Sequence, residues 1–179
     1  MKMEAGLKIV RAGGLAVPAG THEGKLIVIG ADHRGFKLKE RLKRILRRRG
    51  WRVKDVGTHS PRRVDYPLIA LKIARPVGAS EGKRAVGIGV CGSGIGVCIV
   101  SAKVPGVFPA LPRDVAQART TRRHNNTNFL CVSAESTTTA RAAAIAEAWL
   151  RTPFCQDPGR DGRYLRRYLQ TARLDRARR

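Results

Sequence analysis

The chain has 179 residues, 42% of them hydrophobic, so one domain of ordinary size with a sizeable core is expected. Its net charge of +23 predicts attraction to polyanions such as nucleic acid, anionic membranes or phosphorylated small molecules, but no apolar stretch is long enough to span a bilayer. The cysteines lack the close pairs of a zinc site, which predicts free thiols in a reducing, cytoplasmic compartment. They are Cys91, Cys98, Cys131 and Cys155.

The segment before residue 25 differs from the rest of the chain. Residues 1–24 contain five glycines and one proline and show no sustained periodicity, which predicts a flexible extension. From residue 25 onward, short apolar runs alternate with stretches in which apolar residues recur at helical spacing. Strands are expected over residues 25–30, 51–56, 85–90, 106–111 and 128–133. Helices are expected over residues 35–49, 67–75, 95–103, 114–123, 138–150 and 162–173.

Strands that alternate with helices favour a parallel sheet covered on both faces. We therefore predict the α/β class, with a three-layer α/β/α sandwich around a five-stranded parallel, Rossmann-like sheet. The folded domain is expected over residues 25–154. Residues 155–179 are very basic and are expected to form a C-terminal helix and tail.

The most distinctive run in the chain places a cysteine between an apolar strand and a glycine-rich turn. Cys91 follows the apolar residues 85–90 and precedes Gly92, Gly94 and Gly96. Glycines let the backbone turn tightly, and the N–H groups of such a turn can hold an anion and favour a neighbouring thiolate. A base beside an anion cradle suits an oxyanion or enediolate intermediate. The alternative is an ordinary strand–helix turn beside a buried cysteine.

Other polar side chains are expected near that cysteine. In open parallel sheets, ligands bind outside the carboxyl ends of the strands. Asp32 and His33 follow the first expected strand, Tyr66 follows the second, and His124 and Asn125 precede the last. We expect most of these groups to gather at one edge of the sheet. Taken singly, Asp32 is equally consistent with a helix cap, and His124 with a capping or core role.

At these positions the chain resembles a known family. Four motifs carry the resemblance: Gly-Ala-Asp-His-Arg-Gly-Phe at 30–36, Asp-Tyr-Pro at 65–67, Cys-Gly-Ser-Gly-Ile-Gly at 91–96 and Arg-His-Asn-Asn-Thr-Asn at 123–128. They are similar to the motifs of the type B ribose-5-phosphate isomerases, a family that also includes galactose-6-phosphate and allose-6-phosphate isomerases. The order of the four motifs makes the resemblance specific.

The resemblance implies an aldose–ketose isomerase that interconverts ribose 5-phosphate and ribulose 5-phosphate without a metal or other cofactor. It implies that the Cys91 thiolate shuttles a proton between C1 and C2 of the open-chain sugar, while Asp32 and His124 assist opening of the furanose ring. The other implied residues bind the substrate: Ser93 and the N–H groups of Gly92, Gly94 and Gly96 at the enediolate oxygens, Tyr66 in the pocket, Asn125 at the sugar hydroxyls, and His33, Arg163 and Arg167 at the phosphate. A homodimer or tetramer is also implied, with the C-terminal helix reaching the neighbouring subunit's site.

Two stretches depart from the family pattern. Residues 132–136 read Val-Ser-Ala-Glu-Ser, and Glu135 stands where the family carries a phosphate-binding arginine. A carboxylate there is expected to repel the phosphate, unless Glu135 faces away or pairs with an arginine such as Arg141. In addition, prolines within residues 106–112 are expected to weaken the fourth strand.

Two other functions stay open from the sequence. One is a non-catalytic relative that binds a phosphorylated ligand or nucleic acid through its basic surface, and the other is an isomerase of six-carbon sugar phosphates. The presence of Cys91, Asp32, His124 and Asn125 favours an enzyme, since a pure binding module does not need all four. The chain has neither zinc-finger spacing nor an RNA-binding aromatic pattern, so binding to nucleic acid is expected to be non-specific at most, and no membrane partner is expected.

Overall fold

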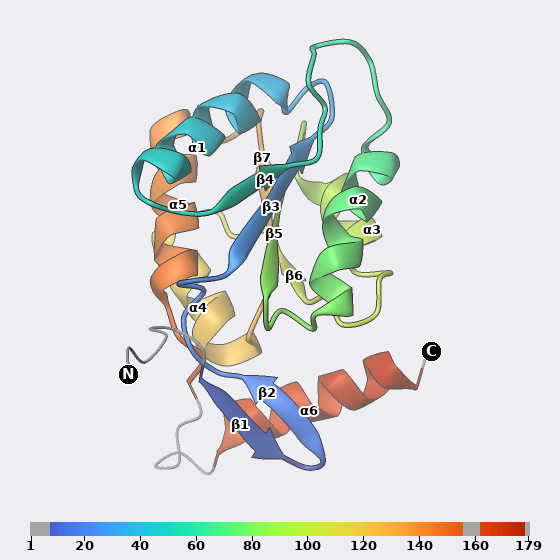
Figure 1. Cartoon of the computed structure of the whole chain (residues 1–179), viewed down its shortest axis with the longest axis vertical. Coiled ribbons are helices and arrows are strands. Elements are labelled where there is room, and N and C mark those ends of the chain that lie inside the picture. The colour runs from blue at the N-terminus through green and yellow to red at the C-terminus, as the bar shows by residue number, and fades with distance from the viewer. Residues whose placement is uncertain (1–7, 156–161, 178–179) are drawn as a thin grey trace.

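A five-stranded parallel sheet forms the centre of the molecule (Figure 1). The computed structural model describes residues 8–155 and 162–177. The strands are β3 (Leu26–Ala31), β4 (Val53–Asp55), β5 (Ala85–Cys91), β6 (Pro109–Ala110) and β7 (Phe129–Ser133). Their order in the sheet is β4-β3-β5-β7-β6, and every neighbouring pair is parallel. The predicted α/β fold is therefore confirmed.

Helices cover both faces of the sheet. They are α1 (Phe36–Arg48), α2 (Tyr66–Ala79), α3 (Ile95–Ser101), α4 (Val115–Asn125), α5 (Thr139–Arg151) and α6 (Arg163–Arg176). Helices α1, α4 and α5 pack on one face, while α2 and α3 pack on the other (Figure 1). Helix α6 lies apart from these layers, beyond one end of the sheet.

The strand β5 divides its side chains between the two cores. Val86, Ile88 and Val90 belong to the cluster under α1 and α5, whereas Ala85 and Cys91 belong to the cluster under α2 and α3. This alternation follows from the two-residue period of a strand. All seven residues of β5 are buried, which agrees with the uninterrupted apolar run typical of a central parallel strand. Cys91 thus comes to the α2–α3 side of the sheet's carboxyl edge.

The register of β5 and β7 defines the two edges of the sheet. Gly87 is paired with Phe129 at the amino ends, and Cys91 is paired with Ser133 at the carboxyl ends. In Figure 1 the carboxyl edge is at the top, with the loop between β4 and α2 above it. The amino edge is at the bottom, where α6 lies.

An antiparallel hairpin of β1 (Ile9–Ala12) and β2 (Leu15–Pro18) precedes the sheet. Its turn is formed by Gly13 and Gly14, both with positive φ angles, 54° and 77°. Two consecutive residues of this kind match the twist of a hairpin, and glycine adopts them without a steric cost. The expected absence of regular structure over residues 1–24 is therefore wrong for this stretch. Four-residue strands carry too little periodicity to be seen in the sequence.

Two elements differ in length from the sequence-based expectation. The fourth expected strand, residues 106–111, shrinks to the two residues of β6 because proline cannot donate a ladder hydrogen bond. Helix α2 continues past its expected end at residue 75 and contains Pro76. At the start of α4, Asp114 accepts a hydrogen bond from the Gln117 N–H (2.7 Å), as expected for an N-cap.

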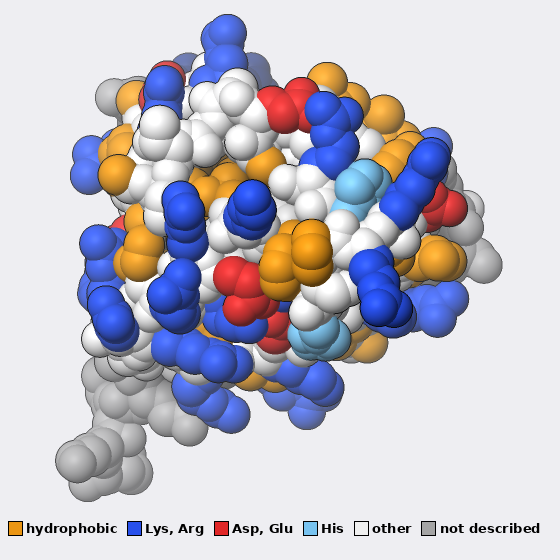
Figure 2. All heavy atoms as spheres, turned by 90° about the horizontal axis from the view of Figure 1, so that it is seen from above, with side chains coloured by type: hydrophobic (Ala, Val, Ile, Leu, Met, Phe, Trp, Pro, Cys, Tyr) orange, Lys and Arg blue, Asp and Glu red, His pale blue; other side chains and the backbone are white. Residues whose placement is uncertain are grey.

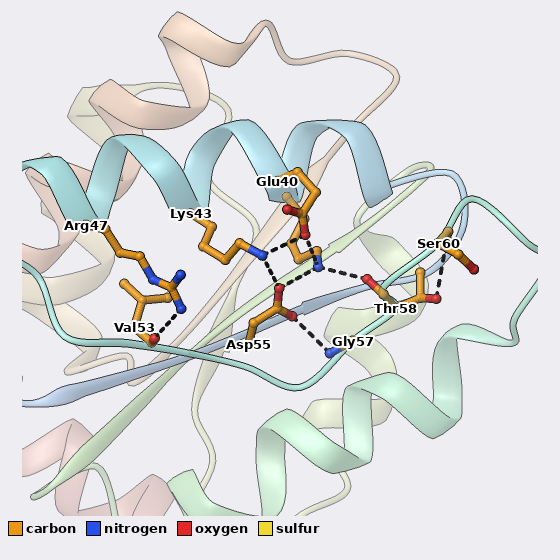
Figure 3. Close-up of polar contacts among 9 residues, drawn as sticks. Glu40, Lys43, Arg47, Val53, Asp55, Gly57, Thr58 and Ser60 are labelled. Carbon is orange, nitrogen blue, oxygen red and sulfur yellow. Dashed lines mark hydrogen bonds and ion pairs between the residues drawn. The ribbon is translucent and has the colours of Figure 1, made fainter.

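A buried lysine, Lys39, joins α1 to the strand β4. Figure 3 shows Glu40, Lys43 and Asp55 of the ion-pair network in which it takes part. The Lys39 ammonium lies 2.7 Å from the Asp55 carboxylate and 2.8 Å from the Thr58 carbonyl oxygen, and its side chain is fully buried. Lys43 and Glu40 complete the ion-pair network around it. Removing one partner of such a buried pair leaves the other uncompensated, so the network fixes the start of the loop between β4 and α2.

The same network makes stability depend on pH. Burial by itself raises the pKa of Asp55, but hydrogen bonds from Lys39 and Lys43 outweigh this and lower the pKa to about 2. A carboxylate with a lowered pKa adds stability above its unfolded pKa, and this stability is lost as the pH falls from about 4 to about 2.

We therefore expect the free energy of unfolding of the unmodified protein to fall by an extra amount on the order of 2 kcal/mol between pH 4 and pH 2, compared with Asp55→Asn. Urea denaturation at a series of pH values measures this difference. Asp65→Asn, which alters an exposed carboxylate, serves as the control and keeps the steep pH dependence. Parallel curves for the unmodified protein and Asp55→Asn would contradict the assignment.

Candidate active site

The site begins at the carboxyl end of β5. Cys91 is 3% exposed, and its Sγ accepts a hydrogen bond from the Gly94 N–H at 3.1 Å. Gly94 has a φ of 77°, a left-handed conformation that favours glycine. The Ser93 Oγ accepts a hydrogen bond from the Ile95 N–H at 3.2 Å. The turn therefore holds the Cys91 sulfur in a fixed position at the carboxyl edge of the sheet, with a backbone donor directed at it.

A cavity of about 370 Å³ opens beside this cysteine. Its wall includes Asp32 and His33 from the end of β3 and Tyr66 from the start of α2. The Asp32 Oδ1 accepts a hydrogen bond from the Gly35 N–H at 2.8 Å, which fixes the turn into α1. The His33 Nδ1 lies 3.2 Å from the Val64 carbonyl oxygen, in the loop between β4 and α2. The remaining lining residues are Arg34, Arg63, Val64, Asp65, Cys91, Gly92, Ser93, Gly96 and Glu135.

The glycine at position 96 makes room for the tyrosine of this wall. A Cβ atom at Gly96 would lie 2.7 Å from the nearest ring atom of Tyr66, closer than real Cβ contacts come. The ring therefore sits directly against the backbone of α3. Tyr66 is still 40% exposed, so one part of the ring faces solvent at the mouth of the cavity.

Glu135 also reaches the Cys91 cavity, where it forms an ion pair with Arg34. Both side chains are about half exposed, at 49% for Glu135 and 62% for Arg34. Of the two outcomes expected for this carboxylate, the structure shows pairing with an arginine, although the partner is Arg34 and not Arg141. The guanidinium of Arg34 offsets the charge that Glu135 brings to the cavity.

A second cavity, of about 440 Å³, holds the other group of expected site residues. It lies between the end of α4, β6 and α6, and its lining includes His124, Asn125 and Arg167. The His124 ring stacks on Tyr164, with centroids 4.0 Å apart and planes 8° from parallel. The Arg163 guanidinium lies 5.0 Å from the centre of the same tyrosine ring.

The two groups lie at opposite edges of the sheet. His124 ends the helix that leads into β7, so it is near Phe129 at the amino edge, whereas Cys91 pairs with Ser133 at the carboxyl edge. The four residue steps of β7 between these ends span roughly 13 Å. The expectation that His124 and Asn125 join Cys91 at one edge is therefore wrong within a single chain. Residues that precede a parallel strand lie at its amino edge.

The face above the carboxyl edge is strongly cationic. Figure 2 looks onto this face and shows Lys and Arg side chains spread across it, with a few Asp, Glu and His side chains between them. Within residues 8–155 and 162–177, no group of three or more His, Cys, Asp or Glu side chains is placed to hold a metal ion. None of the helices in those residues is long and apolar enough to cross a membrane.

Two features of the site were not predicted from the sequence. The Arg34–Glu135 pair joins the loop after β3 to the loop after β7, and nothing in the local sequence of either indicates the other. The stacking of His124 on Tyr164 likewise joins α4 to α6. A weak signal existed for the second, because Tyr164 lies between Arg163 and Arg167 in the sequence.

Comparison with known proteins now adds to this geometry. A family model described as Ribose/Galactose Isomerase matches residues 27–167. The ribose-5-phosphate isomerase B of Escherichia coli (strain K12) is 35% identical over 130 residues, which are 73% of this chain and 86% of that protein. A probable ribose-5-phosphate isomerase B of Mycoplasma genitalium is 33% identical over 150 residues, 83% of this chain and 95% of that protein.

Solved structures agree with the sequence relatives. A ribose-5-phosphate isomerase B of Clostridium thermocellum has a TM-score of 0.78 and 34% identity, covering 86% of this chain and 99% of that one. The Mycoplasma genitalium enzyme, solved with bound ribulose-5-phosphate, has a TM-score of 0.77 and 32% identity, covering 84% and 96%. The chain thus belongs to the ribose/galactose isomerase family, and within it to the type B ribose-5-phosphate isomerases.

The geometry of the Cys91 turn predicts the effect of adding a methyl group at Gly94. Gly94→Ala places a residue with a Cβ in the left-handed region, and that Cβ would lie 2.6 Å from a methyl carbon of Leu111 and 3.0 Å from the Ser133 nitrogen. We expect a loss of about 2–4 kcal/mol in the free energy of unfolding, measured by urea denaturation.

Gly14→Ala is the matched control for this change. Gly14 has the same φ of 77°, but a Cβ added there would have no other atom within 4 Å, so only the conformational cost applies. We expect this variant to lose about 1–2 kcal/mol. If both variants lose the same amount, the close packing around Gly94 does not contribute.

Proposed function

We propose that this protein is an aldose–ketose isomerase that interconverts ribose 5-phosphate and ribulose 5-phosphate. The observation that carries the proposal is the Cys91 Sγ, held by the Gly94 N–H inside a cavity that also contains Asp32 and His33. Type B relatives about a third identical to this chain, one of them solved with bound ribulose-5-phosphate, support the choice of substrate.

Cys91 is assigned as the base that transfers the proton. Its thiolate removes the proton from C2 of the open-chain aldose, and the electron pair of the broken C–H bond forms the C1–C2 double bond of an enediolate. The aldehyde oxygen at C1 takes up the negative charge. The hydroxyl proton on O2 passes to O1, which moves the negative charge to O2. The thiol then returns its proton to C1 as the C2 oxygen becomes the ketone, so no atom is gained or lost. The Gly94 N–H stays on the sulfur and stabilises each thiolate state.

The neighbouring groups are assigned to the oxygens of the substrate. The Ser93 hydroxyl and the N–H groups of Gly92 and Gly96, whose residues line the cavity, are assigned to stabilise the charge that develops on the enediolate. The Gly94 N–H and the Ile95 N–H already donate to the Cys91 Sγ and the Ser93 Oγ within the turn. Fewer N–H groups are therefore left to bind the enediolate oxygens. Asp32 holds the turn into α1 with one oxygen and is assigned to ring opening with the other.

A second copy of the chain completes the site in this proposal. His124, Asn125 and Arg167 lie at the other edge of the sheet and cannot reach the Cys91 cavity of their own chain. The outer faces of α2 and α3 beside that cavity expose large apolar side chains, which a symmetric dimer would bury. They are Tyr66 (40% exposed), Leu68 (59%), Ile95 (55%) and Ile99 (56%). The partner's copies of His124 and Asn125 then assist ring opening and hold the sugar, and its Arg163 and Arg167 bind the phosphate.

The enzyme is favoured over a non-catalytic binding protein by this same cavity. Charge alone binds polyanions without a buried cysteine beside a glycine-rich turn. A coupled isomerase assay with ribose 5-phosphate and with six-carbon sugar phosphates tests the activity and the length of the sugar together. Absence of turnover on all of them would overturn the proposal.

Cys91→Ser is expected to keep the fold and lose about 10²–10⁴-fold in kcat, because an unaided serine hydroxyl is a far weaker base than a thiolate. The coupled assay measures the loss, and circular dichroism checks the fold. Cys155→Ser is the matched control, since Cys155 is a free, partly buried thiol outside the cavity. Near-normal turnover in Cys91→Ser would show that another residue is the base.

A shared site predicts that two inactive variants restore each other. Co-expressed Cys91→Ser and His124→Ala subunits form mixed dimers in which one of the two sites has both wild-type halves. We expect recovery of up to about a quarter of wild-type activity from random pairing. Cys91→Ser co-expressed with Asp32→Asn is the control, because both changes fall in the same half and no site is rebuilt. Equal activity in the two mixtures would exclude a shared site.

A further inference from the structure

The N-terminal segment, defined here as residues 8–22, lies outside the family match, which begins at residue 27. It nevertheless packs at the amino edge of the sheet, against the elements that carry His124 and Arg167 (Figure 1). A flexible extension makes no such contacts. Two sets of interactions link this segment to the second cavity.

The first link runs through a fully buried arginine. Arg122 lies one turn before the end of α4, and its guanidinium donates to the Gly20 carbonyl oxygen of the N-terminal segment at 3.1 Å. It also donates to the Asn126 Oδ1 (2.8 Å) and the Thr127 carbonyl oxygen (2.7 Å), in the turn that directly follows His124 and Asn125, and to the Thr152 carbonyl oxygen (3.2 Å). One side chain therefore ties the segment to this turn.

The same turn receives a second contact from the segment. The His22 Nε2 lies 3.3 Å from the Thr127 carbonyl oxygen, and the His22 ring packs 4.5 Å from Trp149. Asn126, one of the two residues of the turn that the Arg122 side chain bonds, has a positive φ of 52° and ends α4. Its N–H donates to the Arg122 carbonyl oxygen, and His22 and the Arg122 side chain add further contacts to the same turn.

The second link is the packing of the hairpin on α6. Leu15, Val17 and Ala19 form a buried cluster with Tyr164, Tyr168 and Ala172, which recur every four residues along one face of the helix. Arg163 and Arg167 each precede one of these tyrosines by one residue. Val17 is only 1% exposed. The hairpin thus sets the rotation of α6, and with it the direction of both arginines.

We propose that the N-terminal segment is a positioning element for substrate binding. Val17 of the segment positions the phosphate-binding helix α6, and Arg122 of α4, which is bonded to Gly20 of the segment, positions the turn after His124. The proposal rests on the proposed function, because it concerns the half of the shared site that binds the phosphate and the sugar. It gives a role to the residues of the segment, which the family match does not include.

Val17→Ala tests the packing link. We expect KM for ribose 5-phosphate to rise by about five-fold with little change in kcat, because phosphate binding is uniform between ground and transition states. Val86→Ala is the matched control: Val86 is fully buried in the main core, and its truncation costs a similar amount of stability without touching the hairpin or α6. Thermal denaturation checks that the two variants are destabilised alike.

Arg122→Lys tests the hydrogen-bonded link, since lysine keeps the charge but cannot bond four acceptors. We expect kcat/KM to fall by at least about ten-fold, with the larger share in KM. Calorimetric binding of ribose 5-phosphate to each variant in a Cys91→Ser background separates positioning from chemistry. This measurement still decides the matter if the unmodified protein proves to have no turnover, the outcome that overturns only the proposed function.

The positioning role is overturned if Val17→Ala binds and turns over ribose 5-phosphate as well as Val86→Ala does, at equal thermal stability of the two variants. If Arg122→Lys fails to fold, Val17→Ala and its control still give the answer. If Val17→Ala alone weakens binding, the role is upheld.

Discussion

The parallel pairing of β5 with β7 determines where every candidate catalytic group lies. In a parallel pair, both strands begin at one edge and end at the other, so Cys91 and Ser133 come together while Gly87 and Phe129 lie a strand's length away. A residue that precedes β7 cannot reach a residue that follows β5. The separation of Cys91 from His124 and the division of the expected site residues between two cavities follow from this constraint. The proposed sharing of the site between two copies of the chain is a response to it.

Different elements pack beyond the two edges of the sheet. At the carboxyl edge, the buried Lys39–Asp55 pair fixes the start of the loop that leads to Tyr66 and contacts His33 through Val64. At the amino edge, the hairpin and α6 close over the turn that carries His124. At each edge a buried cation holds a loop or turn beside a cavity. Lys39 binds a carboxylate, and Arg122 binds backbone and amide oxygens.

The arginine side chains of the chain lie in three different surroundings: the protein interior, an ion pair at the rim of the Cys91 cavity, and the wall of the second cavity. Burial lowers the pKa of Arg122 to about 9, so its guanidinium is still charged at neutral pH and keeps its hydrogen bonds. On the exposed rim of the Cys91 cavity, Arg34 is paired with Glu135 and its charge is offset. Arg167 of α6 lines the second cavity, where its guanidinium is the group proposed to bind a phosphate.

The sequence by itself determined the succession of strands and helices from residue 25 onward and the class of fold, and it indicated Cys91 as the candidate base, because buried strands and glycine turns leave local patterns of few residues. It also indicated the prolines that shorten β6. It did not show that His124 lies away from Cys91, that Glu135 pairs with Arg34, or that residues 9–18 form a hairpin on α6. These features depend on contacts between residues far apart in the chain, and only the tertiary structure decides which distant side chains meet.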